Sequence, residues 1–354
     1  MDYQELQNGE PTATATAPKG RLSPPRGRIR RSRLLVNLVT VVVTLTFSYV
    51  ALRNIDLALA WRSLRTSDPW WLVASLIAFG VSAVTRAARW RSLFARGRRP
   101  ALQAVANAMS IGYFYNNILP ARAGEAARVL VLAQRSSTAP VEIVGTVVLE
   151  RLYDVLAILV IFFAAKPWLP HVSWFGAAAI AAIVLALALT VVALVLAVYG
   201  DRPMRFLLTP LSRLSLFSGE RLEHTISELT HGLSGLRHPG LALEAFLWTI
   251  VSWLTTAACA YFVTVAFHLH LSFACGVLVV VAIGLGMILP SAPAAVGVFE
   301  GAALIALQVY RIPHSSALPY ALVLHLVNFV PFTILGAFLL HYNSRHPRSV
   351  AEEP

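Results

Sequence analysis

The chain has 354 residues, of which 57% are hydrophobic and only 13% charged, and its mean hydropathy is +0.67. A soluble globular domain carries about 25% charged residues, so this composition excludes a single water-soluble core of this size. The formal net charge of +12 does not indicate nucleic-acid binding, because the basic residues are concentrated in tails and short loops between apolar runs. The apolar runs are continuous rather than alternating, so they predict membrane-spanning helices rather than barrel strands.

The chain begins with a polar and basic segment, residues 1–33, which predicts a disordered cytoplasmic tail. The run 34–52 is longer than the roughly 7–15 residues of a signal-peptide core, so we expect a retained first span. Further apolar segments lie at 70–86, 101–119, 123–133, 141–164, 174–199, 241–266, 273–289, 294–310 and 318–341. We therefore expect an all-α polytopic membrane domain, residues 34–341, of about eight transmembrane helices. A cytoplasmic tail, residues 342–354, would follow.

Two adjacent pairs of these segments are interrupted at a Leu-Pro step, one pair at Pro120 and the other at Pro290. Proline removes a backbone donor and turns the preceding residue away from helix, so each pair is predicted to form a re-entrant hairpin. Gly124 eases the first turn, and Pro293 and Gly297 interrupt the second. Three crossings separate the hairpins, so they would enter from opposite faces, as in an inverted-repeat transporter with a midplane site.

Membrane orientation follows from the basic residues, which gather on the cytoplasmic side of membrane proteins. They concentrate in the N-terminal tail, in the segment 86–99 after the second apolar run, and in residues 200–240. Both termini are therefore predicted to be cytoplasmic, in a cell-membrane protein, and Arg86 and Arg89 would lie in a surface loop. Residues 200–240 fit amphipathic helices on the inner membrane face, or a docking surface for a partner.

The first group of polar residues inside apolar sequence occupies residues 116–128 and includes Asn117. Charges inside spans usually face a cavity or each other. Glu125 would sit in the first turn of the half-helix after the break, where the helix dipole favours an anion. Arg122 precedes that turn and Arg128 follows Glu125 by one turn. An arginine beside free N–H groups in a membrane cavity predicts a phosphate site.

The second group is Glu150, Arg151 and Asp154, in the middle of a span. Glu150 and Asp154 share a helix face, and Arg151 reaches Asp154 at i,i+3. One interpretation is an internal ion pair that neutralises itself. The other is that one carboxylate anchors Arg122 or Arg128 while the other titrates during transport.

The third group follows the second break, where Ile288-Leu289-Pro290 echoes Ile118-Leu119-Pro120 and Glu300 comes after it. His325 and Asn328 in the last span fit helix packing better than ligand binding. His268 and His270 lack nearby carboxylates, and Cys259 and Cys275 have neither disulfide nor zinc spacing. We therefore expect no metal and no cofactor. A nucleotide phosphate loop, a His-Glu-x-x-His motif and a Gly-x-Ser-x-Gly elbow are absent from the sequence.

Together these motifs resemble the transmembrane region of the lysylphosphatidylglycerol synthase family, also called the flippase-like family. The resemblance covers roughly residues 34–341 and rests on these positions: Arg86, Arg89, Trp90, Asn117, Pro120, Arg122, Gly124, Glu125, Arg128, Glu150, Arg151, Asp154, Pro290, Pro293, Gly297 and Glu300. It implies a helical fold with re-entrant elements and a role in moving lipids or lipid-linked head groups between leaflets. The full synthases carry an aminoacyl-transferase domain after this region, and that activity is not expected in a chain that stops at Pro354.

Our hypothesis from the sequence is therefore a flippase-like transporter of a phospholipid or polyprenyl-phosphate-linked substrate. Arg122 and Arg128 would hold the lipid phosphate, Glu150 and Asp154 would balance the arginines or carry a proton, and Arg86 and Arg89 would gather anionic head groups. The substrate-binding candidates are Arg86, Arg89, Asn117, Arg122, Glu125, Arg128, Glu150, Arg151, Asp154, Glu300 and Asn328. An intramembrane lipid-modifying enzyme that uses the same carboxylates as acid and base is the first alternative. A non-transporting accessory subunit with an enzyme partner in the membrane or cytoplasm is the second.

Overall fold

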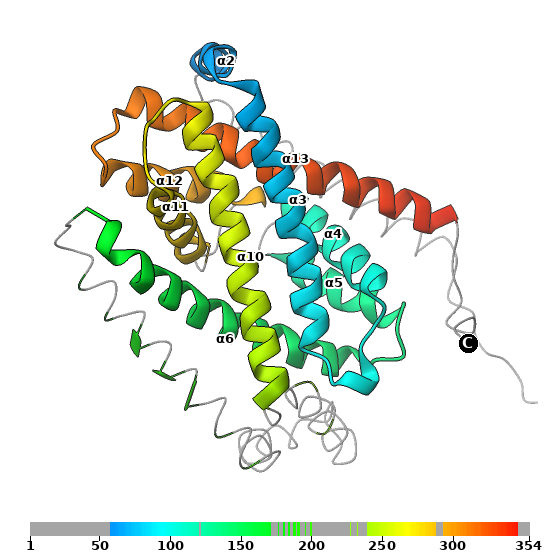
Figure 1. Ribbon diagram of the computed structural model, residues 1–354. Coiled ribbons are helices and arrows are strands. Elements are labelled where there is room, and N and C mark those ends of the chain that lie inside the picture. The colour runs from blue at the N-terminus through cyan, green and yellow to red at the C-terminus, as the bar shows by residue number, and fades with distance from the viewer. Residues whose placement is uncertain are drawn as a thin grey trace, which may run out of the picture. The chain divides into compact units, whose positions relative to one another are not determined.

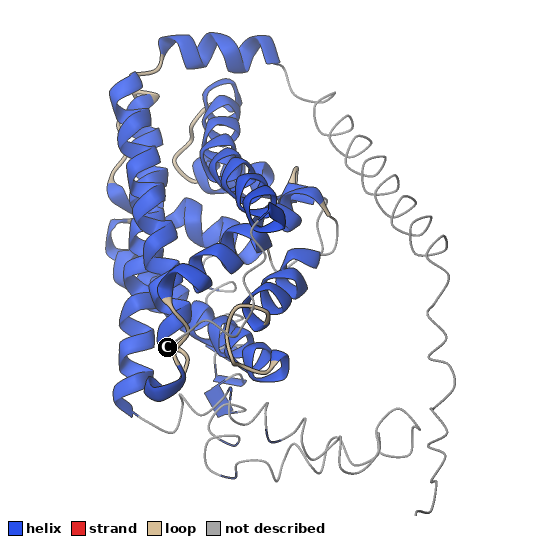
Figure 2. Cartoon of the chain, turned by 90° about the vertical axis from the view of Figure 1, so that its right-hand side faces the viewer, coloured by secondary structure: helices blue, strands red, loops and turns tan. Residues whose placement is uncertain are grey.

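The computed structural model describes residues 57–119, 122–170, 239–287 and 293–345, together with scattered helical positions between 176 and 232. Within these ranges every regular element is helical, which confirms the all-α prediction (Figures 1 and 2). The proposed tail 1–33, the span 34–52 and the loop 200–240, apart from a few positions, lie outside the described residues, as do Pro120 and Pro290.

The helices confirm most of the apolar segments that the sequence predicts. In chain order they are α2 (Leu57–Thr66), α3 (Pro69–Ser92), α4 (Leu102–Ile118), α5 (Ala123–Ala133), α6 (Pro140–Ala165), α10 (Pro239–Ala266), α11 (Phe273–Gly286), α12 (Val298–Gln308) and α13 (His314–Arg345). Three helices of the described ranges, α3, α10 and α13, are long and apolar enough to cross a membrane. Helix α13 continues to Arg345, so the predicted C-terminal tail starts later than residue 342.

Helices α3 and α10 run antiparallel and pack against each other along their length (Figure 1). The N–H of Asp68, which caps α3, donates to the carbonyl of Ala266 at the far end of α10, at 2.9 Å. Between the two helices Ser82 Oγ and Thr256 Oγ1 are 2.7 Å apart. Small and hydroxyl side chains allow close helix approach in a membrane, where lipid gives apolar packing little advantage.

This antiparallel pair places the two broken hairpins at opposite ends. The α4–α5 hairpin follows the C-terminal end of α3, and the α11–α12 hairpin follows the C-terminal end of α10. Each hairpin is succeeded by a long helix, α6 in the first half and α13 in the second. In the described ranges α3 and α10 are thus antiparallel and each is followed by a broken hairpin and then a long helix, which is the order of elements that the inverted-repeat hypothesis requires.

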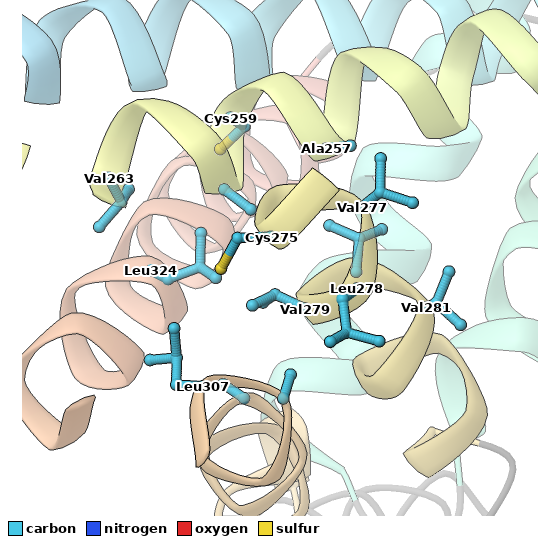
Figure 3. Packing of buried hydrophobic residues seen from close by; sticks show 14 of the residues in the cluster. Ala257, Cys259, Val263, Cys275, Val277, Leu278, Val279, Val281, Leu307 and Leu324 are labelled. Atoms are coloured by element: carbon cyan, nitrogen blue, oxygen red, sulfur yellow. The ribbon is translucent and has the colours of Figure 1, made fainter. Parts of the chain in front are cut away.

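The second half is packed around an apolar cluster of small and branched side chains (Figure 3). Cys259 of α10 and Cys275 of α11 are buried in it as free thiols, beside Val263 and Leu324. Tyr320 of α13 is fully buried and donates its hydroxyl to the carbonyl of Ala260 at 3.1 Å. The cluster fixes α10, α11, α12 and α13 as one body behind the site described below.

The α3 helix differs from the sequence prediction in one respect that matters for function. It continues to Ser92, so Arg86 and Arg89 lie on the helix and the surface loop predicted to contain them begins only after it. The prediction was wrong because it ended the span where the apolar residues end. Carboxylates from α6 compensate the charge of Arg89, and the helix can therefore carry this arginine inside the protein.

The first hairpin is closed by an approach that only glycine permits. A Cβ atom on Gly124 would lie 1.9 Å from the carbonyl oxygen of Gly112, on the opposite helix. Asn116 Oδ1 accepts the N–H of Gly124 at 2.8 Å, which satisfies a donor at the start of α5. Gly112 and Asn116 of α4 are thus held against Gly124 of α5.

We expect Gly124→Ala to destabilise the protein, by about 1–3 kcal/mol, because the added methyl must displace backbone atoms of α4. Gly80→Ala in α3 is the matched control, since a Cβ there meets nothing within 4 Å. The measurement is the thermal unfolding midpoint of purified protein in detergent. Equal midpoints for the two variants would contradict the packing described for the first hairpin.

Candidate functional site

A cavity of about 510 Å³ lies where the two hairpins meet helices α3, α6, α10 and α13. Its volume is within the range of small-molecule sites. Leu119 and Arg122 line it from the first hairpin, and Met287 and Ala294 from the second. The ends of both broken hairpins therefore open onto one chamber, as the inverted-repeat hypothesis requires.

One wall of the cavity is a buried network of charges that begins at Arg89. Its side chain donates to Glu150 Oε1 at 2.6 Å and also to Asp154 Oδ1. Arg89 is only 4% exposed and Glu150 only 2%. Asp154 further accepts the indole N–H of Trp253 from α10, at 2.9 Å. A single arginine on α3 thereby ties together two turns of α6.

The network continues through Arg128 and Glu125 of α5. Arg128 donates to Glu150 Oε2 at 2.9 Å and to Glu125 Oε2 at 2.8 Å, and its guanidinium lies 4.8 Å from the centre of the Trp90 ring. Arg151 closes the network by donating to Glu125 Oε1 at 2.5 Å. It also lies 3.5 Å from Asp154, at the i,i+3 spacing that the sequence predicted.

The members of this network balance in charge. Three arginines (89, 128 and 151) face three carboxylates (125, 150 and 154), and every one of the six has an opposite charge within ion-pair distance. Buried charges are tolerated only when they are paired in this way, since the desolvation cost of a lone ion is several kcal/mol. The network itself therefore adds no net charge to the cavity.

Two further arginines line the cavity and stand outside this balance. Arg86 donates to Thr256 Oγ1 at 3.0 Å and to the hydroxyl of Tyr113 at 3.4 Å, which are neutral partners. Arg122 is the residue before α5 and holds a left-handed backbone conformation with φ 56°. Within the described part of the chain neither has a carboxylate at ion-pair distance. The cavity thus carries surplus positive charge at two points.

The opposite wall is mostly apolar and contains a histidine–carboxylate pair at the second hairpin. His325 Nδ1 of α13 lies 2.5 Å from Glu300 Oε1 of α12, and His325 Nε2 lies 3.0 Å from the carbonyl oxygen of Ala294. Glu300 Oε2 accepts the N–H of Gly297 at 2.7 Å. The histidine ring, which stacks on Phe299 with a centroid distance of 4.5 Å, faces the cavity.

The two asparagines among the candidates have different positions. Asn117 donates to Thr333 Oγ1 at 2.8 Å and to the Phe329 carbonyl at 3.3 Å, so it links the first hairpin to α13. Asn328 lines the cavity while donating to the Leu324 carbonyl of its own helix at 2.8 Å.

The structure brings most of the candidate residues to this one cavity. The candidates that line it are Arg86, Arg89, Asn117, Arg122, Glu125, Glu150, Arg151, Asp154 and Asn328. Arg128 and Glu300 stand behind the lining and contact it through Glu150 and His325. Of the hairpin breakers, Gly124 begins α5, Pro293 opens the short 3-10 turn η5 (Pro293–Ala295), and Gly297 precedes α12 with φ 85°.

Sequence reasoning missed several lining residues. Tyr113, Trp253 and Thr256 carry ordinary membrane-helix side chains, and no local pattern separates them from packing residues. His325 was assigned to packing, although a histidine inside an apolar span is itself a signal for a cavity. Among the described residues no group of three or more His, Cys, Asp or Glu side chains is placed to hold a metal ion.

Comparison with known proteins places the chain in a family. The family model described as the lysylphosphatidylglycerol synthase TM region matches residues 36–336, so the chain belongs to that family. The chain is also 24% identical over 251 residues to the UPF0104 membrane protein MJ1078 of Methanocaldococcus jannaschii. That match covers 68% of this chain and 97% of the relative. No solved structure matches the chain significantly.

We expect Arg89→Leu to lower the free energy of unfolding by about 3–5 kcal/mol, because it leaves two buried carboxylates without their central cation. Arg86→Leu, one turn earlier on the same helix, removes only bonds to hydroxyl groups and should cost less than about 1.5 kcal/mol. Thermal unfolding of both variants in detergent measures the difference. If the two variants unfolded at the same temperature, Arg89 would not be the centre of the network.

Proposed function

We propose that this member of the family moves an anionic phospholipid or lipid-linked head group between the leaflets of the cell membrane. The surplus positive charge of Arg86 and Arg122, in a cavity reached by both broken hairpins, is the observation that carries the proposal. An uncompensated cation in an apolar chamber is costly, and an anionic ligand that enters the chamber offsets that cost.

The chemistry around Arg122 favours a phosphate group. Arg122 directly precedes α5, and the dipole of that helix favours negative charge at this end. A guanidinium presents paired donors that match two phosphate oxygens. Arg86 supplies a second cation from α3, so that the acidic head group would be held between α3 and the first hairpin.

The arrangement favours transport over lipid modification. Three of the four candidate carboxylates, Glu125, Glu150 and Asp154, are each engaged by two arginines, which stabilise the charged form and suit neither a general acid nor a general base. The two halves, in contrast, run in opposite directions with their hairpins meeting at the site. That geometry suits alternating access from the two leaflets. We further propose that both termini are cytoplasmic, and that any enzyme partner would bind through residues 200–240.

The test is leaflet-resolved movement of fluorescent phosphatidylglycerol and of a fluorescent polyprenyl phosphate in proteoliposomes. We expect the wild type to move one or both lipids. Arg122→Gln and Arg86→Gln should reduce the rate by about tenfold or more, the effect of losing a charge-assisted hydrogen bond in the bound state. Glutamine keeps most of the side-chain length and leaves the backbone strain at position 122 unchanged.

The matched control is Arg62→Gln in α2, an exposed arginine that does not line the cavity. It should move lipid at the wild-type rate. Absence of movement by folded wild-type protein would contradict the proposal, and so would an unchanged rate in both cavity variants. Mass spectrometry of the lipids after the assay should show no new species, whereas a modified lipid would identify an enzyme instead.

A further inference from the structure

We propose that His325 and Glu300 together hold one exchangeable proton, and that release of this proton opens the second hairpin and couples substrate movement to a proton gradient. The inference rests on the proposed function and extends it by naming an energy source. It starts from the hydrogen bonds that surround the imidazole ring.

Both ring nitrogens of His325 face acceptors. Nε2 lies 3.0 Å from the carbonyl oxygen of Ala294, which can only accept, so Nε2 must carry a hydrogen. Nδ1 lies 2.5 Å from Glu300 Oε1, and at that distance a hydrogen must lie between the nitrogen and the oxygen. Either the imidazole is doubly protonated beside a carboxylate, or a neutral imidazole accepts from a carboxylic acid. In both forms the pair contains one proton more than a neutral histidine with an ionised glutamate.

The second carboxylate oxygen of Glu300 is already used. It accepts the N–H of Gly297 at 2.7 Å, so the carboxylate cannot rotate away from His325 without losing that hydrogen bond. If the shared proton left, the ring would keep one hydrogen for two acceptors, the Glu300 carboxylate and the Ala294 carbonyl. The acceptor left without a hydrogen would face a nitrogen lone pair and be repelled, so the deprotonated pair must give up one of these two bonds.

Among the described residues, the charged groups around the cavity are not hydrogen-bonded to His325 or Glu300, so the conformation of the pair depends on its own proton. Phe299 and Phe329 cover the ring, with centroid distances of 4.5 and 5.9 Å. The electrostatic partners of Glu300 among the described residues are His325 and the local backbone. The charged groups on the same cavity from the other elements are Arg86 and Arg89 of α3, Arg122 and Glu125 of the first hairpin, and Glu150, Arg151 and Asp154 of α6. None of these is hydrogen-bonded to the pair.

The segment that the pair holds is conformationally strained. Ala294 and Ala295 have φ angles of 58° and 59°, in the left-handed region, where a residue with a Cβ costs about 1–2 kcal/mol. Gly297 follows with φ 85°. His325 binds the carbonyl of Ala294, and Glu300 binds the N–H of Gly297, so the pair clamps both sides of this turn. Loss of the clamp lets the strained turn relax.

These observations give a sequence of events for one transport step. With the proton bound, the turn 293–297 is clamped and the second hairpin closes its side of the cavity. When the proton leaves, the ring can no longer donate to both acceptors, so one side of the clamp is lost, the turn is released and that side of the cavity opens. Transport then proceeds with proton binding on one side of the membrane and release on the other.

The first experiment measures opening without any lipid substrate. Val296→Cys places a thiol in the clamped turn, and its rate of reaction with a membrane-impermeant thiol reagent is followed in proteoliposomes from about pH 5 to about pH 8, the range in which histidine titrates. Cys259 and Cys275 are buried, so the untreated chain gives the background. The reference is the double variant with Val296→Cys and Glu300→Gln. Dividing the labelling rate of Val296→Cys by that of the double variant removes the effect of pH on the reactivity of the thiol itself.

Glu300→Gln mimics the protonated pair. The amide oxygen can accept from Gly297 while the amide N–H donates to Nδ1 of a neutral histidine, so the clamp persists at every pH. We expect the ratio of the labelling rate with Glu300 to the rate with Glu300→Gln to rise at least about fivefold as the pH increases, because a larger fraction of the protein has then lost the shared proton. His325→Gln, which cannot hold both acceptors, should label rapidly even at low pH. A ratio that stays constant with pH, or slow labelling of the His325→Gln variant, would overturn the proton clamp.

The second experiment applies a pH gradient to the lipid-movement assay. Wild-type movement should be faster in one gradient direction than in the other, and Glu300→Gln should lose that difference. Lipid movement that is indifferent to the gradient would refute the coupling while the proposed function stands. No lipid movement together with pH-dependent labelling would refute the proposed function and leave the proton clamp supported.

Discussion

The structure depends on how α6 carries charge through the interior of a membrane protein. Glu150 and Asp154 sit in the middle of a 26-residue helix and cannot face lipid. Arg89 must therefore approach from α3 and Arg128 from α5, which fixes the position of the first hairpin against α6. Apolar side chains of the hairpin also pack in a buried cluster with α3 and α6. The ion pairs add to this packing and place the charged residues of the hairpin at the wall of the cavity.

The sequence predicts those parts of this arrangement that depend on local spacing. The position of Glu125 in the first turn of α5 and the Arg151–Asp154 pair follow from helical periodicity, and the structure confirms both. The pairing of Arg89 with residues more than sixty positions away has no local signature. For the same reason the sequence placed the end of α3 too early. A charged residue can lie within a membrane helix when a partner of opposite charge lies across from it.

The two halves share a direction-reversed order of elements but differ in chemistry. The first half supplies the arginines and the balanced network, whose interlocking pairs resist rearrangement because each guanidinium serves two carboxylates. The second half offers an apolar wall and a turn with left-handed residues held by two side chains. A rigid wall is suited to binding a charged group, and a strained turn is suited to moving. Under the proposed function, the first half would therefore bind the substrate and the second half would gate the cavity.

Under the proposed function, this division would also avoid the energetic cost of separating buried ion pairs in each transport cycle. If the arginines that bind substrate were themselves the moving part, each cycle would separate buried ion pairs at a cost of several kcal/mol. The six charges of the network are paired with one another, and among the described residues Arg86 and Arg122 have no carboxylate at ion-pair distance. Under the proposed function, a substrate would enter and leave without disrupting the ion pairs between the first hairpin and α6. Movement would be confined to the turn 293–297, whose left-handed residues favour release, so that opening would not weaken the rest of the fold.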